Sequence, residues 1–289
     1  MSTRALAATL GLLVLPAAAA EPRSPQAAPA PAAPAAAAAA ETGAPRSAKV
    51  WIGRYDEYAE YLRTAKVDKV ESVPIGVTKP ERAFFAPGGL ARSAAVKHLP
   101  PGNRSGFWES YKSEVAAYEL DRLLGMDMVP PTVARRVGSD LASVQLWVEG
   151  CRLLKELDQS KCPNPTEWAK QVCRQRVFDN LVANVDRNQG NLLVDEAWNM
   201  ILIDHSRAFA ADRMPFEKDM ARVDRPFFDA LKALDQARLM EHVRPWLTSD
   251  REVRDILKRR DRIVARFEAL ARERGEAVVF PFPPAPGAR

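Results

Sequence analysis

The chain has 289 residues, of which 47% are hydrophobic and 8% aromatic, and its formal net charge at pH 7 is +5. This length and composition can bury one sizeable core, or two lobes that share a cleft, which excludes a protein disordered throughout. Lysine and arginine are interspersed with aspartate and glutamate, so the chain lacks the basic stripe that binds nucleic acid, and no nucleic-acid partner is expected.

The first 20 residues have the layout of a secretory signal. Arg4 precedes an apolar run from Ala5 to Leu15, and small residues follow as a cleavage region. Residues 21–48 repeat alanine and proline and contain almost nothing that could be buried, which indicates a disordered linker. We therefore expect an exported protein (periplasmic, secreted or in a secretory lumen), or a cytoplasmic one if this segment is not a signal. No other segment is long and apolar enough to cross a bilayer.

Residues 49–149 form the first predicted lobe, which is small and rich in strands. Turn residues and short apolar runs over 72–97 predict three antiparallel strands. The spacing of apolar residues over 110–124 predicts a helix that Gly125 ends. Two further runs between residues 129 and 148, separated by a Gly-Ser-Asp turn, predict a second hairpin.

Residues 150–282 form the second predicted lobe, which is mainly helical, and residues 283–289 form a tail. A helix that begins near Thr166 has an apolar face and leads into a polar loop. A hairpin over 191–203 follows this loop, and the remainder is dominated by helices, the last of which has a capping signature at Ser249. The expected fold class is α+β.

The three cysteines are Cys151, Cys162 and Cys173. None of them forms a C-x-x-C pair, which argues against a zinc site. Export would permit one disulfide among them, but three unpaired and mostly buried cysteines are an equally good interpretation.

The most informative segment is the loop D-R-N-Q-G-N at residues 186–191, followed by two short apolar runs and Asp204. This layout is typical of the catalytic loop and metal-binding segment of a phosphotransferase. Asp186 would orient or deprotonate an attacking hydroxyl. The amide oxygen of Asn191 and the carboxylate of Asp204 would hold the metal ion that neutralises the phosphates of a nucleotide. A hairpin between them brings Asp204 back beside the loop.

Two other interpretations of this loop compete with phosphotransfer. Its aspartate and asparagines could serve only an Asx-turn at the entry of the hairpin. A calcium loop of the EF-hand type would need glycine in place of Asn191 and a bidentate acid in place of Ala197, so that interpretation fails. Asp204 lies behind an apolar run and would be costly to bury unless it binds something, which favours phosphotransfer.

A phosphotransferase of this kind also needs a lysine that contacts the phosphates and a glutamate that holds the lysine. Lys97 ends the predicted strand Ala94–Lys97, and Glu114 on the next helix is the predicted partner. Glu119, on a different face of that helix, is the alternative. The turn at 75–82 that should cover the phosphates has one glycine rather than three, and the chain contains neither a Walker A sequence nor G-x-G-x-x-G.

The run from Phe178 to Leu193, together with Ile203-Asp204, resembles the atypical kinases of the phosphoinositide 3/4-kinase-like group. It is also similar to the four-jointed kinases of the secretory pathway. The resemblance spans roughly residues 70 to 275 and is specific from Asp179 to Phe209. It implies a two-lobed, protein-kinase-like fold that binds ATP with Mg²⁺ or Mn²⁺.

The same resemblance implies a role for each candidate residue. Asp186 would be the catalytic base, and Asn191 and Asp204 would be the metal ligands. Lys97 and Glu114 would form the pair that positions the phosphates. All of these positions carry the expected polar residue, which favours an active enzyme.

Two departures from the typical kinase pattern follow Asp204. His205 and Ser206 stand where an Asp-Phe-Gly segment has phenylalanine and glycine. His205 could be a metal ligand, a phosphate contact or a packing residue, and we favour packing or a hydrogen bond to a neighbouring group. Two functions therefore stay open. One is a kinase that moves the γ-phosphoryl group of ATP to a hydroxyl of a protein or small molecule, and the other is a pseudokinase that binds nucleotide or a partner without turnover.

Overall fold

The computed structural model describes three segments: residues 46–74, 80–210 and 213–282. Four parts of the sequence interpretation lie wholly or largely outside them: the leader over 1–20, the linker up to residue 45, most of the turn at 75–82, and the tail over 283–289. The described residues form an α+β fold with a strand-rich part and a helical part, as the sequence predicts.

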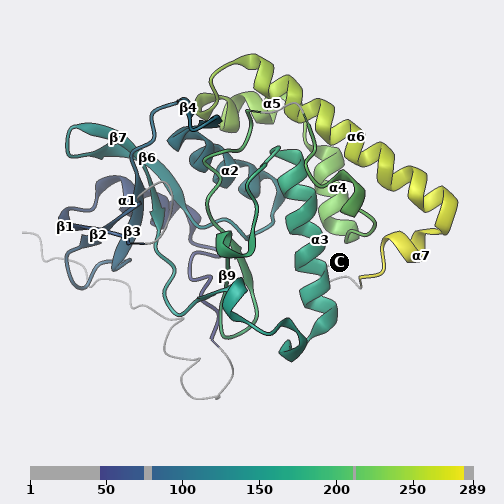
Figure 1. Ribbon diagram of the computed structural model, residues 1–289, viewed down its shortest axis with the longest axis horizontal. Helices are drawn as coiled ribbons and strands as arrows, with labels where there is room; N and C mark the ends of the chain where they lie inside the picture. The colour runs from purple at the N-terminus through teal and green to yellow at the C-terminus, as the bar shows by residue number, and fades with distance from the viewer. Residues whose placement is uncertain (1–45, 75–79, 211–212, 283–289) are drawn as a thin grey trace, which may run out of the picture. The chain divides into compact units, whose positions relative to one another are not determined.

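A five-stranded antiparallel sheet with the order β1-β2-β3-β7-β6 forms most of the strand-rich part (Figure 1). Its strands are β1 Val67–Ser72, β2 Glu81–Phe85, β3 Ser93–Lys97, β6 Thr132–Val137 and β7 Asp140–Leu146. Alternation along β3 buries Ala94 and Val96 completely in the core on one face of the sheet. Lys97 therefore lies on the other face.

Helix α2 (Tyr111–Leu124) begins and ends where local sequence signals place it. Ser110 caps its start by accepting a hydrogen bond from the backbone of Lys112. Gly125 ends it with a φ of 59°, a left-handed conformation that glycine adopts at low cost. Both predicted ends are thus confirmed. The helix lies between the sheet and the helical part, in contact with β6, β7 and α4 (Arg225–Ala233).

The helical part also contains a small three-stranded sheet of order β10-β9-β8, which contacts α3. The strands are β8 Arg152–Leu153, β9 Leu192–Val194 and β10 Met200–Leu202. Besides α4, the helices are α3 Pro165–Leu181, α5 Gln236–Arg238, α6 Asp250–Arg274 and α7 Glu276–Val279 (Figure 1). The hairpin β9–β10 follows the polar loop after α3, so the structure confirms this order of elements.

Four details differ from the sequence prediction. Helix α1 (Tyr55–Thr64) and the short hairpin of β4 (Gly102–Arg104) and β5 (Phe107–Glu109) are additional elements. Strand β1 lies earlier than the first predicted run. Residues Leu239–Val243 form a π-helical turn within the part of the chain where the sequence predicts ordinary helices. The three cysteines are all unpaired, as one of the two interpretations expects, but only Cys162 is buried, and Cys151 and Cys173 are half-buried.

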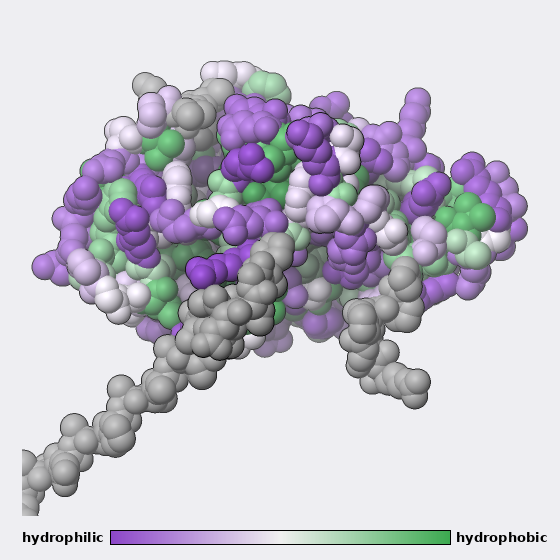
Figure 2. Space-filling view, turned by 90° about the horizontal axis from the view of Figure 1, so that it is seen from below, coloured by the Kyte–Doolittle hydropathy of each residue, from purple (hydrophilic) through white to green (hydrophobic). Residues whose placement is uncertain are grey.

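The surface agrees with a mixed-charge composition. On the face shown in Figure 2, hydrophilic residues cover most of the visible surface and apolar residues form small separate patches. Among the helices of the described segments, none combines the length and the apolarity that crossing a bilayer requires.

Candidate active site

Three charged side chains from separate elements meet at the end of β3. Lys97 Nζ lies 2.6 Å from Glu114 Oε1 and 2.8 Å from Asp204 Oδ1. Glu114 belongs to the first turn of α2, and Asp204 follows the last strand, β10. The Lys97 side chain is 13% exposed and that of Glu114 only 2%. The Asp204 side chain is 27% exposed, so sheet, helix and hairpin contribute one charge each to a cluster that is only partly open to solvent.

Mutual attraction keeps this cluster ionised against the effect of burial. Desolvation alone would lower the pKa of Lys97, but the carboxylates of Asp204 and Glu114 raise it above its ordinary value. Desolvation would raise the pKa of Glu114, but the charge of Lys97 and the contact with His205 hold it below its usual range. Lys97 lowers the pKa of Asp204 against burial in the same way. The lysine and both carboxylates are therefore charged at neutral pH.

The backbone of Asp204 is strained. Its φ is 61°, in the left-handed region that costs a non-glycine residue about 1–3 kcal/mol. Hydrogen bonds on both sides hold it there: the backbone N–H of Ile203 donates to the carbonyl of Asn191, and Ser206 Oγ donates to Asp204 Oδ1 at 3.1 Å. Such over-determined strain clusters at functional sites, which supports a functional role for this carboxylate.

In the loop after α3, asparagine side chains make the local hydrogen bonds, and the Asp186 side chain makes none of them. Asn184 Oδ1 accepts from the backbone N–H of Asp186, and Asn188 Oδ1 accepts from that of Gly190. Asn191 Nδ2 donates to the carbonyl of Asp186 at 3.1 Å. The Asx-type bonds of the competing structural interpretation are therefore made by neighbouring asparagines, and the Asp186 carboxylate remains available for chemistry.

The Asp186 carboxylate faces a cation that the sequence did not single out. Arg207 Nη1 lies 3.1 Å from Asp186 Oδ2, and the same guanidinium contacts Glu109 and lies over the ring of Phe107 at 4.3 Å. Burial raises the pKa of Asp186; Arg207 offsets part of this rise, and the charge of Asp204 adds to it. The Asp186 side chain is 41% exposed, so an incoming hydroxyl can reach it.

Arg187 joins the loop to the hairpin. Its side chain is 4% exposed; it donates to Asp179 at 2.9 Å and to the carbonyls of Asn191 and Ile203, both at 2.7 Å. It also contacts the ring of His205, which is completely buried. Burial lowers the pKa of this histidine, and Glu114 opposes the shift only in part. His205 thus packs and forms hydrogen bonds, as we favoured from the sequence.

The donor set fits a small divalent cation. Asn191 uses Nδ2 for its bond to the loop, which leaves Oδ1 for another contact. Asp204 Oδ1 is occupied by Lys97 and Ser206, whereas Oδ2 accepts no hydrogen bond within the described segments. Carboxylate and amide oxygens suit Mg²⁺ and Mn²⁺. The described segments hold no group of three or more His, Cys, Asp or Glu that could bind a metal ion, so water and phosphate oxygens would complete the coordination of an ion held here.

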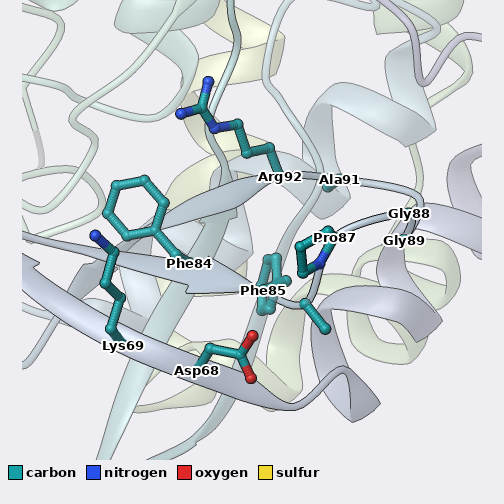
Figure 3. Close-up of a pocket in the computed structure, with 10 residues that line it drawn as sticks. Asp68, Lys69, Phe84, Phe85, Pro87, Gly88, Gly89, Ala91 and Arg92 are labelled. Atoms are coloured by element: carbon teal, nitrogen blue, oxygen red, sulfur yellow. The ribbon is translucent and has the colours of Figure 1, made fainter.

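A surface cavity in the strand-rich part lies away from this cluster. It has a volume of about 620 Å³ and is lined by β1, β2 and the loop before β3 (Figure 3). Phe84, Phe85 and Pro87 contribute rings, and Lys69 and Arg92 contribute cations. None of the predicted site residues lines it. We therefore assign the candidate active site by the convergence of charged groups at Lys97.

Comparison with protein-family models gives no match, and neither does comparison with curated proteins. Among solved structures, the chain is similar to the Golgi casein kinase with Mn and ADP bound, at 16% identity over 78% of each chain and a TM-score of 0.60. It is also similar to hydra Fam20 with sugar, at 15% identity over 78% of this chain and 91% of that chain, with a TM-score of 0.56.

These similarities show the fold. The protein has the kinase-like fold of the Golgi casein kinase and hydra Fam20 structures, with a small strand-rich lobe and a mainly helical lobe. The finer expectation, membership of the phosphoinositide 3/4-kinase-like group, stays a prediction.

Proposed function

We propose that this protein is an ATP-dependent kinase that moves the γ-phosphoryl group to a hydroxyl on a protein or small molecule. The observation that carries the proposal is the contact of Lys97 with both Glu114 and Asp204 within a kinase-like fold. A lysine held by a helix glutamate is the arrangement that positions nucleotide phosphates in kinases. The Golgi casein kinase structure, which has Mn and ADP bound, supports the same ligand class for this chain.

Each residue of the cluster has a distinct proposed role. Lys97, held by Glu114, positions the phosphates of ATP. Asn191 and Asp204 hold Mg²⁺ or Mn²⁺, which when bound neutralises negative charge on those phosphates. Asp186 orients the acceptor hydroxyl and accepts its proton, because its carboxylate is partly exposed and lies on the loop beside Asn191.

One observation favours the second candidate, a pseudokinase that binds nucleotide without turnover. The guanidinium of Arg207 contacts Asp186 Oδ2 and so covers part of the carboxylate that would accept the proton. An arginine at this distance stabilises the ionised, hydrogen-bonded form of an aspartate. It could thus hold Asp186 away from a substrate, or orient it for one, and the transfer assay separates these two outcomes.

We also propose the domain limits and the cellular location that the sequence indicates. Residues 1–20 would be a signal peptide, 21–48 a linker, 49–149 the first lobe and 150–282 the second, in an exported protein. Their support is the layout of the leader and the secretory setting named for the Golgi casein kinase. N-terminal sequencing of the protein recovered from its producing cell should give a start near Glu21, and an intact Met1 would reject the signal.

The central experiment is phosphoryl transfer from labelled ATP with Mn²⁺ or Mg²⁺ to a panel of proteins and small hydroxyl compounds. Asp186→Asn should retain nucleotide-induced thermal stabilisation but lose transfer, whereas Asp204→Asn should lose both. Asp56→Asn is the matched control, because Asp56 is an exposed aspartate of α1 whose side chain is 89% exposed.

The outcomes separate the two candidate functions. Transfer that survives in both Asp186→Asn and Asp204→Asn would reject the site. Metal-dependent stabilisation by nucleotide with no transfer from the wild-type protein would identify the pseudokinase. If neither transfer nor stabilisation occurs, nucleotide is not the ligand and both proposals fail.

A further inference from the structure

His205 lies in the middle of a buried chain of polar contacts. Its ring is completely buried and packs edge-on against Phe178, with ring centroids 5.9 Å apart. Arg187 Nη2 lies 2.8 Å from His205 Nε2, and the backbone N–H of His205 donates to Glu114 Oε2 at 3.0 Å. One residue therefore contacts both the arginine of the polar loop and the glutamate that holds Lys97.

The chemistry of Arg187 fixes the tautomer of this ring. A guanidinium has donors and no acceptor, so Nε2 of His205 must accept the hydrogen bond and carries no proton. The ring proton therefore belongs to Nδ1, which lies 3.8 Å from Glu114 Oε2. That separation is too long for a hydrogen bond, and Nδ1 is a buried polar atom without a partner in the described segments. An unsatisfied buried donor is tolerated rarely, which marks this position as specialised.

Arg187, at the other end of this chain of contacts, is also held by several hydrogen bonds. Arg187 donates to both carboxylate oxygens of Asp179, at 3.1 and 2.9 Å, and Asp179 is completely buried. Arg187 also donates to two backbone carbonyls, those of Asn191, a proposed metal ligand, and of Ile203, the residue before Asp204. Arg187 thus sets the relative position of the two segments that carry the proposed metal-binding oxygens.

We propose that His205 is a positioning residue that couples the Lys97–Glu114 pair to the catalytic loop through Arg187. This inference rests on the proposed function of the site. A phenylalanine could fill the same volume and would keep the backbone N–H that donates to Glu114 Oε2, but it could not accept a hydrogen bond from Arg187. The histidine therefore adds a hydrogen bond to Arg187 at a position where an apolar ring would be enough to fill the core. These contacts thereby fix the position of Lys97 relative to the oxygens of Asn191 and Asp204.

A spectroscopic experiment tests the linkage independently of any activity. The chain has only three histidines, so a protein labelled with ¹⁵N-histidine gives few ring signals, and His205→Gln identifies the signal of interest by its loss. We expect that signal to report a neutral ring with the proton on Nδ1 at pH 7. A proton on Nε2, or on both nitrogens, would overturn the inference even if the protein proves to be an active kinase.

A kinetic comparison tests the consequence. In His205→Gln the new side chain would place an amide oxygen near the position of Nε2 and keep the acceptor for Arg187, whereas the Phe and Asn variants would lose it. We expect His205→Phe and His205→Asn to lower kcat by about 10- to 100-fold, with KM for ATP changed less than about threefold, because a misplacement of about 1 Å costs up to that much. His205→Gln should stay within about threefold of wild type. His242→Gln, at an exposed histidine, is the control.

Each result of this comparison decides the question. Equal kcat values for wild type and His205→Phe, or equal impairment of the Gln and Asn variants, would overturn the coupling. If His205→Phe fails to fold, the Gln and Asn variants carry the test, with melting temperatures measured without nucleotide. If the wild-type protein shows no transfer, the proposed enzyme fails while the coupling is still decided, because the nucleotide-induced thermal shift should persist in His205→Gln and shrink in His205→Asn.

Discussion

Helix α2 buries two carboxylates, two turns apart, that have opposite character. Glu114 lies 2.6 Å from Lys97 Nζ, and its pKa is held below the usual range. Asp121 is 1% exposed, and its Oδ1 accepts hydrogen bonds from the backbone N–H groups of Met128 and Val129 at 3.0 and 3.1 Å. Burial raises its pKa to about 7 despite these bonds. The same helix therefore carries one acid that is ionised at neutral pH and one that titrates near neutral pH.

The difference shows what burial requires of a charge. Two backbone N–H dipoles offset only part of the desolvation of Asp121, whereas a cation in direct contact more than offsets that of Glu114. The N-terminal end of α2, where Glu114 contacts Lys97, belongs to the candidate active site. Near its C-terminal end, Asp121 binds the backbone of the segment that follows the helix. Replacing Lys97 should make the two acids alike, because Glu114 would lose the cation that keeps it ionised. Neutralising Glu114 or Asp121 alone should show how much each acid contributes to stability.

Lys97→Met should have the largest effect. It removes the cation and leaves Glu114 and Asp204 partly or fully buried beside each other, and breaking a buried ion pair in this way costs about 3–5 kcal/mol. The free energy of unfolding at pH 7 measures the loss, and the transfer assay should show none above background. Lys69→Met is the matched control, because Lys69 pairs with Glu71 on the surface and should change stability by less than about 1 kcal/mol. Wild-type stability in Lys97→Met would refute the ionised cluster.

Asp121→Asn should have the next largest effect, and it should be stabilising. The unfolded pKa of Asp121 is about 3.9 and its folded pKa about 7, so the folded state binds the proton more tightly and stability falls as pH rises between these values. Asparagine keeps an oxygen for both backbone donors and has no charge to desolvate. Lys49 and Asp127, the charged groups nearest to Asp121, shift its pKa in opposite directions.

Chemical denaturation at pH 5 and pH 8 checks this sign. The Asn variant should gain roughly 2–4 kcal/mol over wild type at pH 8 and progressively less towards pH 5. Asp68→Asn, at an exposed acid of β1, serves as the control. A variant that is destabilised equally at both pH values would show that Asp121 is ionised and needed as an anion.

Helix α2 also shows which features the sequence could predict. Its start at Ser110, its end at Gly125 and its apolar spacing are local signals, and all three are confirmed. The pairing of Glu114 with Lys97 was predicted because a kinase needs a strand lysine held by a glutamate of the next helix, and Lys97 contacts Glu114 as expected. By contrast, the strain at Asp204 and the ionisation of Asp121 depend on chain segments that only the folded structure brings together.

The missed parts of the site are those with distant partners. Arg207 contacts Glu109, which lies 98 residues away, and His205 contacts Glu114 across 91 residues. Neither pair belongs to the kinase pattern that brings Lys97 and Asp204 into one site, so nothing in a single sequence indicates these contacts. The sequence does not predict the hairpin β4–β5, because its strands have three residues each, too few for a visible alternation.

Glu114→Gln should have a smaller effect and the opposite pH dependence to Asp121→Asn. Because the folded pKa of Glu114 is depressed, its contribution to stability is complete above the unfolded value of about 4.3 and is lost as pH falls below it. We expect a loss of roughly 1–3 kcal/mol at pH 7, since Lys97 keeps its contact with Asp204. The free energies of unfolding of wild type and Glu114→Gln, measured from pH 7 to pH 3, should become more alike as the pH falls. A constant difference would mean that packing, and not charge, holds this glutamate.

Ser110→Ala should have the smallest effect, and it tests whether the contrast belongs to the side chains or to the helix as a whole. Ser110 Oγ accepts from the backbone N–H of Lys112 at 3.0 Å, and loss of such a cap costs about 1 kcal/mol. The backbone N–H of Ser110 should still donate to the carbonyl of Ser206, so the helix stays attached to the segment after Asp204. Because no ionisable group changes, the loss in denaturant midpoint should be the same at pH 5 and pH 8, and Ser110→Asp should recover most of it. A loss that varies with pH would mean that the helix start, and not the local partner of each acid, sets the two pKa values.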